Sequence, residues 1–110
     1  GKETWLALTK DYCFKCIVVY AGCSTSLQYL EEKEETNCIA SGRGYYWYHD
    51  ENGELAKKEV GPGFGVHLLP GVVHRFEAIE DITLFEASTI QVDDVVRLED
   101  SYGRKGTSAP

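Results

Sequence analysis

Residues 61–74 read Gly-Pro-Gly-Phe-Gly-Val-His-Leu-Leu-Pro-Gly-Val-Val-His, and this stretch decides the fold. Glycine and proline at 61–63 and 70–71 predict two tight turns, because glycine reaches positive φ angles and proline presets φ for a turn. Short apolar runs near 65–69 and 73–78 follow the turns, and each has the length of a strand. The stretch therefore predicts two strands joined by a tight turn.

The same pattern continues in both directions along the chain. Short apolar or alternating runs, separated by Gly, Pro, Asn or Asp, predict strands near 4–9, 14–20, 25–30, 36–41, 44–50, 55–59, 65–69, 73–78, 82–88 and 94–98. Asn52-Gly53 predicts a hairpin between two of them. Residues 30–35 are strongly charged, and we interpret them as a loop. Many short strands with regular turns indicate a closed barrel or a sandwich.

Length and composition indicate one globular domain. The chain has 110 residues, of which 43% are hydrophobic and 26% are charged. A second independent core does not fit this length. We assign residues 1–103 to the domain and expect the Gly-, Ser-, Lys- and Pro-rich tail 104–110 to be disordered.

Charge and hydropathy argue against two classes of partner. The formal net charge is −7, and no basic run is longer than the pairs Lys57-Lys58 and Arg104-Lys105, so we expect no nucleic-acid partner. No apolar run approaches the ~20 residues that span a bilayer, so we expect no membrane partner. The first five residues lack a signal-peptide pattern. We therefore expect a cytoplasmic protein, although Gly1 leaves room for a missing natural leader.

Four cysteines lie in the first half of the chain. The spacing Cys13-x-x-Cys16 is typical of zinc and redox sites. A zinc site needs a second close pair, and Cys23 and Cys38 are too far apart to supply it. A redox motif precedes a helix, whereas this pair begins a β-rich run. We interpret the cysteines as buried structural thiols.

Two blocks of the sequence carry a family resemblance. The first runs from Gly22-Cys23-Ser24-Thr25-Ser26-Leu27-Gln28-Tyr29-Leu30 through Glu35 to Ser41-Gly42, and the second comprises 61–63 and 67–74. Together they resemble the two cupin motifs. The Ser-Leu-Gln-Tyr of the first block and the closing segment 93–104 are similar to phosphomannose isomerase-like cupins. The resemblance implies an all-β, single-domain cupin, which is a double-stranded β-helix or jelly-roll barrel.

The resemblance also implies a site for one divalent metal inside the barrel. The four ligand positions of the family fall on Gln28, Leu30, Glu35 and His74. Leu30 stands where the family has a histidine, so the ligands expected here are Gln28, Glu35 and His74. An amide is a weak ligand, and zinc or iron sites usually use three good ones. We therefore expect either a single Zn, Mn, Fe or Ni ion or none.

Strand alternation selects further pocket residues. Side chains two positions apart share a face, which groups Gln28 with Leu30, Glu35 with Asn37, and Tyr46 with Tyr48. Glu86 lies on an apolar strand, and the sequence leaves open whether it faces the lumen or water, as it does for His67. The residues expected to contact a substrate are Gln28, Leu30, Asn37, Tyr46, Tyr48 and Glu86. Tyr45 and Trp47 would then lie outside, and an exposed aromatic pair predicts a homodimer.

Three functions remain open. The first is a metal-assisted isomerase or epimerase acting on a small sugar-like substrate, with His74 and Glu35 as the acid/base pair. The second is isomerase- or lyase-like proton transfer on a small polar or carbonyl-containing substrate, with a vestigial metal site or none. In that case Leu30 would enlarge the apolar part of the pocket and suit a more hydrophobic ligand than a sugar. The third is a non-catalytic ligand-binding or regulatory cupin. The sequence shows no Lys/Arg cluster for phosphate, since only Lys15, Lys33, Arg43 and Arg75 lie near the motif strands and Arg97 reads as structural or interfacial.

Overall fold

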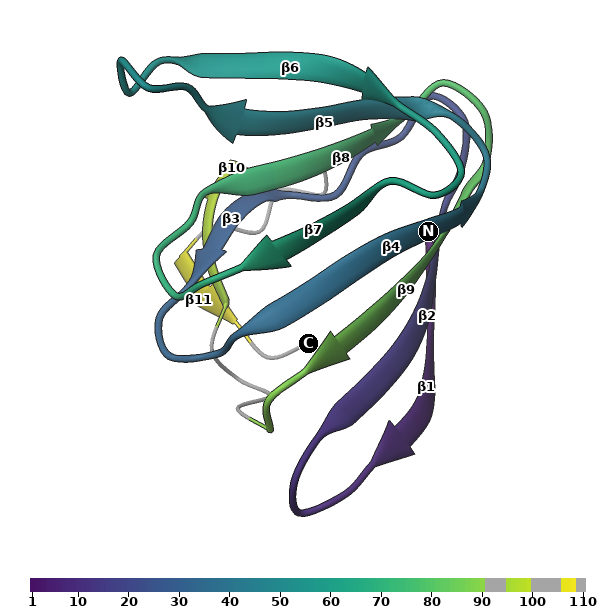
Figure 1. Ribbon diagram of the computed structural model, residues 1–110, viewed down its shortest axis with the longest axis vertical. Coiled ribbons are helices and arrows are strands. Elements are labelled where there is room, and N and C mark those ends of the chain that lie inside the picture. The colour runs from purple at the N-terminus through teal and green to yellow at the C-terminus, as the bar shows by residue number, and fades with distance from the viewer. Residues whose placement is uncertain (91–94, 100–105, 109–110) are drawn as a thin grey trace.

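Two facing β-sheets make up the part of the chain that can be described (Figure 1). The structure is a computed structural model that describes residues 1–90, 95–99 and 106–108. The strands are β1 (Lys2–Leu8), β2 (Cys13–Val19), β3 (Leu27–Leu30), β4 (Glu35–Ser41), β5 (Gly44–His49), β6 (Leu55–Val60), β7 (Gly65–Leu68), β8 (His74–Ala78), β9 (Ile82–Ser88), β10 (Val95–Glu99) and β11 (Gly106–Ser108).

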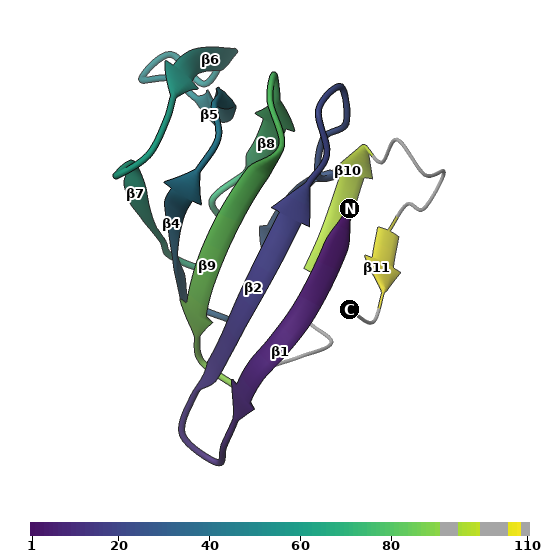
Figure 2. The same ribbon diagram turned by 90° about the vertical axis from the view of Figure 1, so that its right-hand side faces the viewer.

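Each sheet mixes strands from distant parts of the sequence. One sheet has the order β1-β2-β9-β4-β7, and the other has the order β11-β10-β3-β8-β5-β6. All the pairings are antiparallel. In the side view of Figure 2 the two sheets face each other, and we call the interior between them the lumen. Side chains that alternate inward along each strand therefore meet in this lumen.

The lumen is apolar at one end and polar at the other. Along β9 the inward residues are Ile82 and Leu84, which are 0% and 1% exposed, and then Glu86 and Ser88. Neighbouring strands change from apolar to polar at the same level because their register aligns the changes. The apolar end is a cluster of buried side chains, made by Val19, Ile39, Tyr46, Val60, Leu68, Phe76, Ala78, Ile82 and Leu84.

Turn geometry matches the residues that the sequence provides. In the β5–β6 hairpin Gly53 has φ 77°, and the Asp50 carboxylate accepts hydrogen bonds from the N–H groups of Asn52 and Glu54. Gly42, between β4 and β5, has φ 88°, and a Cβ atom there would collide with the carbonyl oxygen of Asp81. Only glycine satisfies both conditions at this corner.

The all-β architecture predicted from the sequence is confirmed, and every predicted strand has a counterpart within a few residues. One expectation needs correction. Residues 106–108 of the tail expected to be disordered form β11, which pairs with β10. The composition of the tail predicts disorder because the tail has little apolar surface to bury. A strand can nevertheless form by backbone hydrogen bonding to the edge of β10, which does not depend on the side chains. The other residues of 104–110 lie outside the described ones, and no helix in the described ranges could cross a membrane.

Candidate functional site

The first half of the site lies on the sheet that contains β2, β9 and β4. Cross-strand pairing places Lys15, Glu86 and Asn37 side by side in one row. The next row toward the polar end pairs Ser88 with Glu35. All five side chains are buried, with exposures between 3% and 7%. These side chains come together because each of β2, β9 and β4 has a polar residue two positions beyond its last inward-facing apolar residue.

The second half of the site comes from the facing sheet. There the register pairs Arg97 with Gln28, Gln28 with His74, and His74 with Tyr48. The Gln28 side-chain oxygen accepts a hydrogen bond of 2.7 Å from the Ser26 hydroxyl group. Two polar rows therefore face each other across the lumen, one on each sheet.

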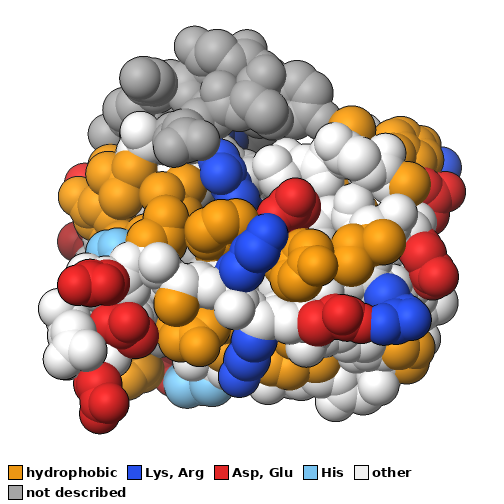
Figure 3. Space-filling view, turned by 90° about the horizontal axis from the view of Figure 1, so that it is seen from above, with side chains coloured by type: hydrophobic (Ala, Val, Ile, Leu, Met, Phe, Trp, Pro, Cys, Tyr) orange, Lys and Arg blue, Asp and Glu red, His pale blue; other side chains and the backbone are white. Residues whose placement is uncertain are grey.

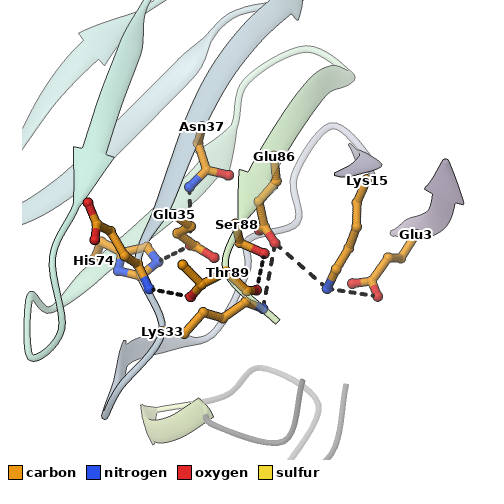
Figure 4. A network of polar contacts seen from close by, with 10 residues as sticks. Glu3, Lys15, Lys33, Glu35, Asn37, His74, Glu86, Ser88 and Thr89 are labelled. Atoms are coloured by element: carbon orange, nitrogen blue, oxygen red, sulfur yellow. Dashed lines mark hydrogen bonds and ion pairs between the residues drawn. The ribbon is translucent and has the colours of Figure 1, made fainter. Parts of the chain in front are cut away.

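His74 and Glu35 meet between the two sheets. Their side chains are 3% and 4% exposed, and His74 Nε2 lies 3.6 Å from Glu35 Oε1 (Figure 4). His74 Nδ1 lies 3.1 Å from the carbonyl oxygen of Val72, which can only accept, so Nδ1 carries a hydrogen. Burial lowers the pKa of His74 and favours the neutral imidazole, whose Nε2 then presents a lone pair toward the carboxylate. His74 Nε2 and the Glu35 carboxylate are both hydrogen-bond acceptors, so one proton can be held between them.

Two neighbours, Asn37 and Tyr46, interact with Glu35. The Asn37 side-chain amide donates a hydrogen bond of 3.1 Å to Glu35 Oε1. Burial, reinforced by the negative charge of Glu35, raises the pKa of Tyr46 to about 12. Glu35 is therefore a buried carboxylate that is oriented by an amide and lies beside an apolar wall.

Glu86 is the second buried carboxyl group. Burial first, then the nearby charge of Glu35 and a side-chain hydrogen bond to it, raise the pKa of Glu86 to about 7, while Lys15 and Lys33 act in the opposite direction. Two carboxyl groups this close do not both ionise readily. At neutral pH the pair can therefore hold a proton acceptor and a proton donor side by side.

Lys15 and Lys33 were not predicted as site residues. Lys15 Nζ lies 3.4 Å from Glu3 Oε1 and 3.7 Å from Glu86 Oε2, and Lys33 Nζ lies 3.9 Å from the same Glu86 oxygen. Both lysines are buried, and Arg97 is only 8% exposed. The expectation that basic residues do not cluster is corrected for these two lysines, and Arg97 lines the same cavity. The signal for Lys15 was present in the sequence, because alternation puts it on the same face as Ile17 and Val19.

These groups line two adjoining cavities. The larger, of about 650 Å³, includes Glu35, Glu86, Gln28 and Leu30 and extends to the exposed N-terminal residues 1–3. The smaller, of about 40 Å³, lies against His74 and Asn37 and shares five lining residues with the larger. Its volume suits one or two water molecules. The larger volume falls within the range of about 300–1,000 Å³ that holds small-molecule ligands.

The structure resolves several orientations that the sequence left open. Glu86 faces the lumen, whereas His67 is exposed and contacts Thr36 and Glu34 outside the barrel. Tyr46 and Tyr48 face inward as a stacked pair with ring centroids 5.9 Å apart. They pack against the apolar core and line neither of the two cavities, so direct substrate contact by either tyrosine does not follow from this arrangement.

The residues at the expected metal position form a weak ligand set. Within 1–90, 95–99 and 106–108, no group of three or more His, Cys, Asp or Glu side chains is placed to hold a metal ion. Gln28, Glu35 and His74 supply one amide, one carboxylate and one imidazole, and Leu30, 2% exposed, fills the fourth position. Two buried lysines already face the neighbouring carboxyl group. This donor set does not fit a tight transition-metal site.

The Cys13-x-x-Cys16 spacing does not form a shared site. On β2 the two residues are three positions apart, so Cys13 faces inward and is fully buried, while Cys16 faces outward. All four cysteines are free thiols. Cys38 is exposed, so the expectation of buried thiols is wrong for it.

Comparison with known proteins shows that the chain is similar in fold to several solved structures. No protein-family profile and no curated protein matches the chain. Among solved structures, the capsular polysaccharide assembling protein CapF from Staphylococcus aureus is 20% identical with a TM-score of 0.77, over 90% of this chain and 32% of CapF. The present chain therefore spans about a third of CapF.

Two further structures resemble the chain. An uncharacterized conserved protein with a double-stranded β-helix domain from Klebsiella pneumoniae is 14% identical, with a TM-score of 0.75 over 90% of this chain and 84% of that protein. A candidate sugar phosphate isomerase from Acidithiobacillus ferrooxidans is 17% identical, with a TM-score of 0.65 over 77% and 55%. Identities this low establish the fold alone. The chain has the fold of a small cupin, the double-stranded β-helix.

Proposed function

We propose that this chain is a small-molecule enzyme that transfers a proton on a small, polar, carbonyl-containing substrate, in the manner of isomerases, epimerases and lyases. The observation that carries the proposal is the buried group of His74, Glu35 and Glu86 at the polar end of the lumen, beside a cavity of about 650 Å³. The pKa values of His74 and Glu86 are shifted, and buried ionisable groups with shifted pKa values in a cavity are typical of acid–base sites. The fold shared with a candidate sugar phosphate isomerase is compatible with this chemistry.

The reaction divides the roles between the two carboxyl groups. The Glu35 carboxylate removes a proton from the carbon next to the substrate carbonyl, and the electron pair moves onto the carbonyl oxygen. Glu86, protonated near its pKa of about 7, donates its proton to that oxygen. Return of a proton to the neighbouring carbon gives an isomer, whereas departure of a leaving group gives a lyase product.

His74 and Asn37 support the base. The Asn37 amide holds one Glu35 oxygen at 3.1 Å, which fixes the carboxylate toward the lumen. His74 Nε2 lies 3.6 Å from the same oxygen and can take over the abstracted proton, because its neutral imidazole has a free lone pair. In this role His74 delivers the proton to the second carbon or to solvent.

A second function is favoured by one specific observation. Leu30 is buried where the metal-binding cupins carry a histidine, and this replacement is what a barrel that has lost its chemistry would show. The alternative is therefore a non-catalytic ligand-binding or regulatory cupin that uses the same cavity.

Deuterium exchange separates the two functions. A panel of small sugars, sugar acids and sugar phosphates is incubated with the protein in D₂O, and loss of the proton next to each carbonyl is followed by NMR. We expect exchange with at least one compound and a loss of about 100-fold or more in Glu35→Gln, since general base catalysis contributes about 10²–10⁴. His74→Ala should slow exchange as well.

The exposed Glu51→Gln, in the β5–β6 turn, is the matched control and should exchange at the wild-type rate. Compounds that bind without exchanging would support the binding module and contradict the enzyme. Exchange that Glu35→Gln leaves undiminished would remove the proposed base.

A further inference from the structure

The smaller of the two cavities, which we call the inner cavity, lies directly against the acid–base group. Its volume is about 40 Å³, and it shares five lining residues with the larger cavity of about 650 Å³. A substrate of monosaccharide size therefore fits only the larger cavity, whereas the inner cavity takes one or two groups of the size of a water molecule.

The three ionisable groups of the site are divided between the cavities. Glu35 and Glu86 line both of them, whereas His74 lines only the inner cavity. A substrate in the larger cavity can therefore meet both carboxyl groups. His74 meets only what enters the inner cavity, so a proton that it delivers goes to a small group there.

The lining of the inner cavity suits an oxygen atom. Its polar side chains are Thr25, Gln28, Glu35, Asn37, His74 and Glu86. A buried water molecule needs about two to four polar partners, and this lining offers more. On the face of the molecule drawn in Figure 3, by contrast, basic, acidic and apolar side chains are interspersed. The gathering of polar groups around the inner cavity is a feature of the barrel interior.

One oxygen of Glu86 calls for a partner of this kind. Glu86 Oε2 is buried and has no hydrogen-bond partner among the described residues. Its contacts with Lys15 and Lys33 are 3.7 and 3.9 Å long, which exceeds the ~2.7–3.2 Å of a hydrogen bond. Buried polar atoms are nearly always hydrogen-bonded, either to protein or to water. A hydroxyl group or a water molecule in the inner cavity would donate the missing bond.

His74 is suited to give a proton to the same small group. Because Nδ1 donates to the Val72 carbonyl oxygen, Nε2 is the atom that takes and gives a proton. In the view of Figure 4, Glu35 lies between His74 and Glu86. Burial lowers the pKa of His74, so its protonated form gives up the proton readily.

We propose that the site eliminates water from a β-hydroxy carbonyl compound, whose hydroxyl group leaves as water into the inner cavity. This inference rests on the proposed function and narrows it from isomerases, epimerases and lyases to hydro-lyases. The substrate class is defined by a hydrogen on the carbon next to the carbonyl and a hydroxyl group on the carbon beyond it.

The protons balance within three side chains. Glu35 removes the proton next to the carbonyl, Glu86 protonates the carbonyl oxygen, and an enol forms. Glu35 passes its proton to His74 Nε2, which lies 3.6 Å away. Glu86 then takes back the enol proton, the carbonyl and a carbon–carbon double bond form, and the bond to the hydroxyl group breaks. The leaving hydroxide takes the proton of His74 and becomes water, so all three side chains return to their starting states.

Product analysis of the wild-type chain in D₂O tests the inference. The probes are glucose, glucose 6-phosphate, glucuronate, glyceraldehyde and 4-hydroxy-2-butanone, which all carry a hydroxyl group β to a carbonyl. Butanone and 3-deoxyglucose lack this hydroxyl group and serve as references that can only exchange. NMR follows the proton next to the carbonyl, and mass spectrometry follows loss of water in the same samples.

We expect at least one β-hydroxy probe both to exchange deuterium and to lose water. Exchange that yields an isomer without any loss of water would overturn the inference and leave the proposed enzyme standing. Neither exchange nor loss of water with any probe would contradict both.

His74→Gln tests the proton donor for the leaving group. Glutamine cannot carry the proton, so loss of water should slow about 100-fold or more. Exchange needs mainly Glu35 and Glu86, so the ratio of water loss to exchange should fall about tenfold or more. The matched control is His67→Gln on the outside of the barrel, which should keep the wild-type ratio. Equal slowing of both processes in His74→Gln would overturn the role of His74, and the wild-type product analysis does not depend on this variant.

Discussion

Glu86 shows how neighbouring residues set the charge of the site. It pairs in register with Lys15 on one side and with Asn37 on the other. Burial and the charge of Glu35 favour its protonated form, and the two lysines oppose them only in part, which leaves its pKa at about 7. A carboxyl group with this pKa is half protonated under physiological conditions, as a general acid requires.

The raised pKa of Glu86 predicts a specific effect of pH on stability. Between pH 4.5, the ordinary value, and about 7, the folded protein keeps a proton that the unfolded chain has released. Stability therefore falls as pH rises through this window. In Glu86→Gln this contribution is absent, so the free energy of unfolding of the variant minus that of the wild type should increase from pH 4.5 to 7. The increase should reach about 3 kcal/mol, at about 1.36 kcal/mol per pKa unit.

Urea unfolding at several pH values measures this difference. His74 acts in the opposite sense, because its lowered pKa costs stability as pH falls below 6.5. The charge of Glu86 raises the pKa of His74, so its removal enlarges this cost in the variant at low pH and adds to the predicted increase of the difference. The exposed Glu51→Gln should show a flat difference. A flat difference for Glu86→Gln as well would mean that the Glu86 carboxyl titrates normally.

Leu30 predicts a gain of metal binding when it is replaced. It lies two positions from Gln28 on the same face of β3, and Gln28 pairs with His74. Leu30→His adds an imidazole to a set that has one, so the variant should bind Zn²⁺ or Ni²⁺ at least about tenfold more tightly than the wild type. Calorimetric metal titration measures the gain, and the exposed Leu69→His is the control. Equal affinities of the Leu30→His variant and the wild type would contradict this geometry.

At the scale of the strands, the sequence predicts which side chains share a face of a strand, but it does not predict which strands are adjacent. Alternation places Gln28 with Leu30 and Tyr46 with Tyr48, and both pairs face the lumen. It cannot state which strands become adjacent, because β2 and β4 meet only through β9, far away in the chain. The approach of Lys15 to Glu86 follows from that long-range pairing. For the same reason, the sequence does not decide whether Glu86 faces water or the lumen.

Gly42, at the corner between β4 and β5, and Gly53, in the β5–β6 turn, predict unequal losses of stability when each is replaced by alanine. Gly53→Ala forces an alanine to a φ of 77° with open space around it, which should cost about 1 kcal/mol. Gly42→Ala meets a similar φ and also collides with the Asp81 backbone, so it should cost about 3 kcal/mol or more. Urea unfolding compares the two variants. Equal losses would show that the corner relaxes freely.

At the scale of the whole molecule, the two ends of the lumen have different roles. The apolar end excludes water and stabilises the barrel, while the polar end holds buried charges at a cost in stability. Within residues 1–90, 95–99 and 106–108, five charged side chains are buried, which indicates selection for something other than stability. The site is assembled from strands of both sheets, so no single sequence motif contains all of its residues.

The outer aromatic residues predict a homodimer. Tyr45 and Trp47 alternate to the outside of β5, where the Trp47 Nε1–H donates to Glu77 Oε1 at 2.8 Å. Light scattering should give about twice the chain mass of 12.3 kDa. Tyr45→Arg should shift the protein toward the monomer, while Tyr12→Arg, at the exposed β1–β2 turn, should not. A monomeric wild type would contradict the prediction.

The central claim is that the side chains of the lumen carry the proton, because Gln28, Glu35 and His74 are too weak a set to hold a catalytic metal. The most direct test measures deuterium exchange on an active compound before and after dialysis against a chelator, with metal content determined by elemental analysis. We predict an unchanged exchange rate with far less than one metal ion per chain. Exchange that disappears on dialysis and returns with Zn²⁺, Mn²⁺, Fe²⁺ or Ni²⁺ would contradict the account.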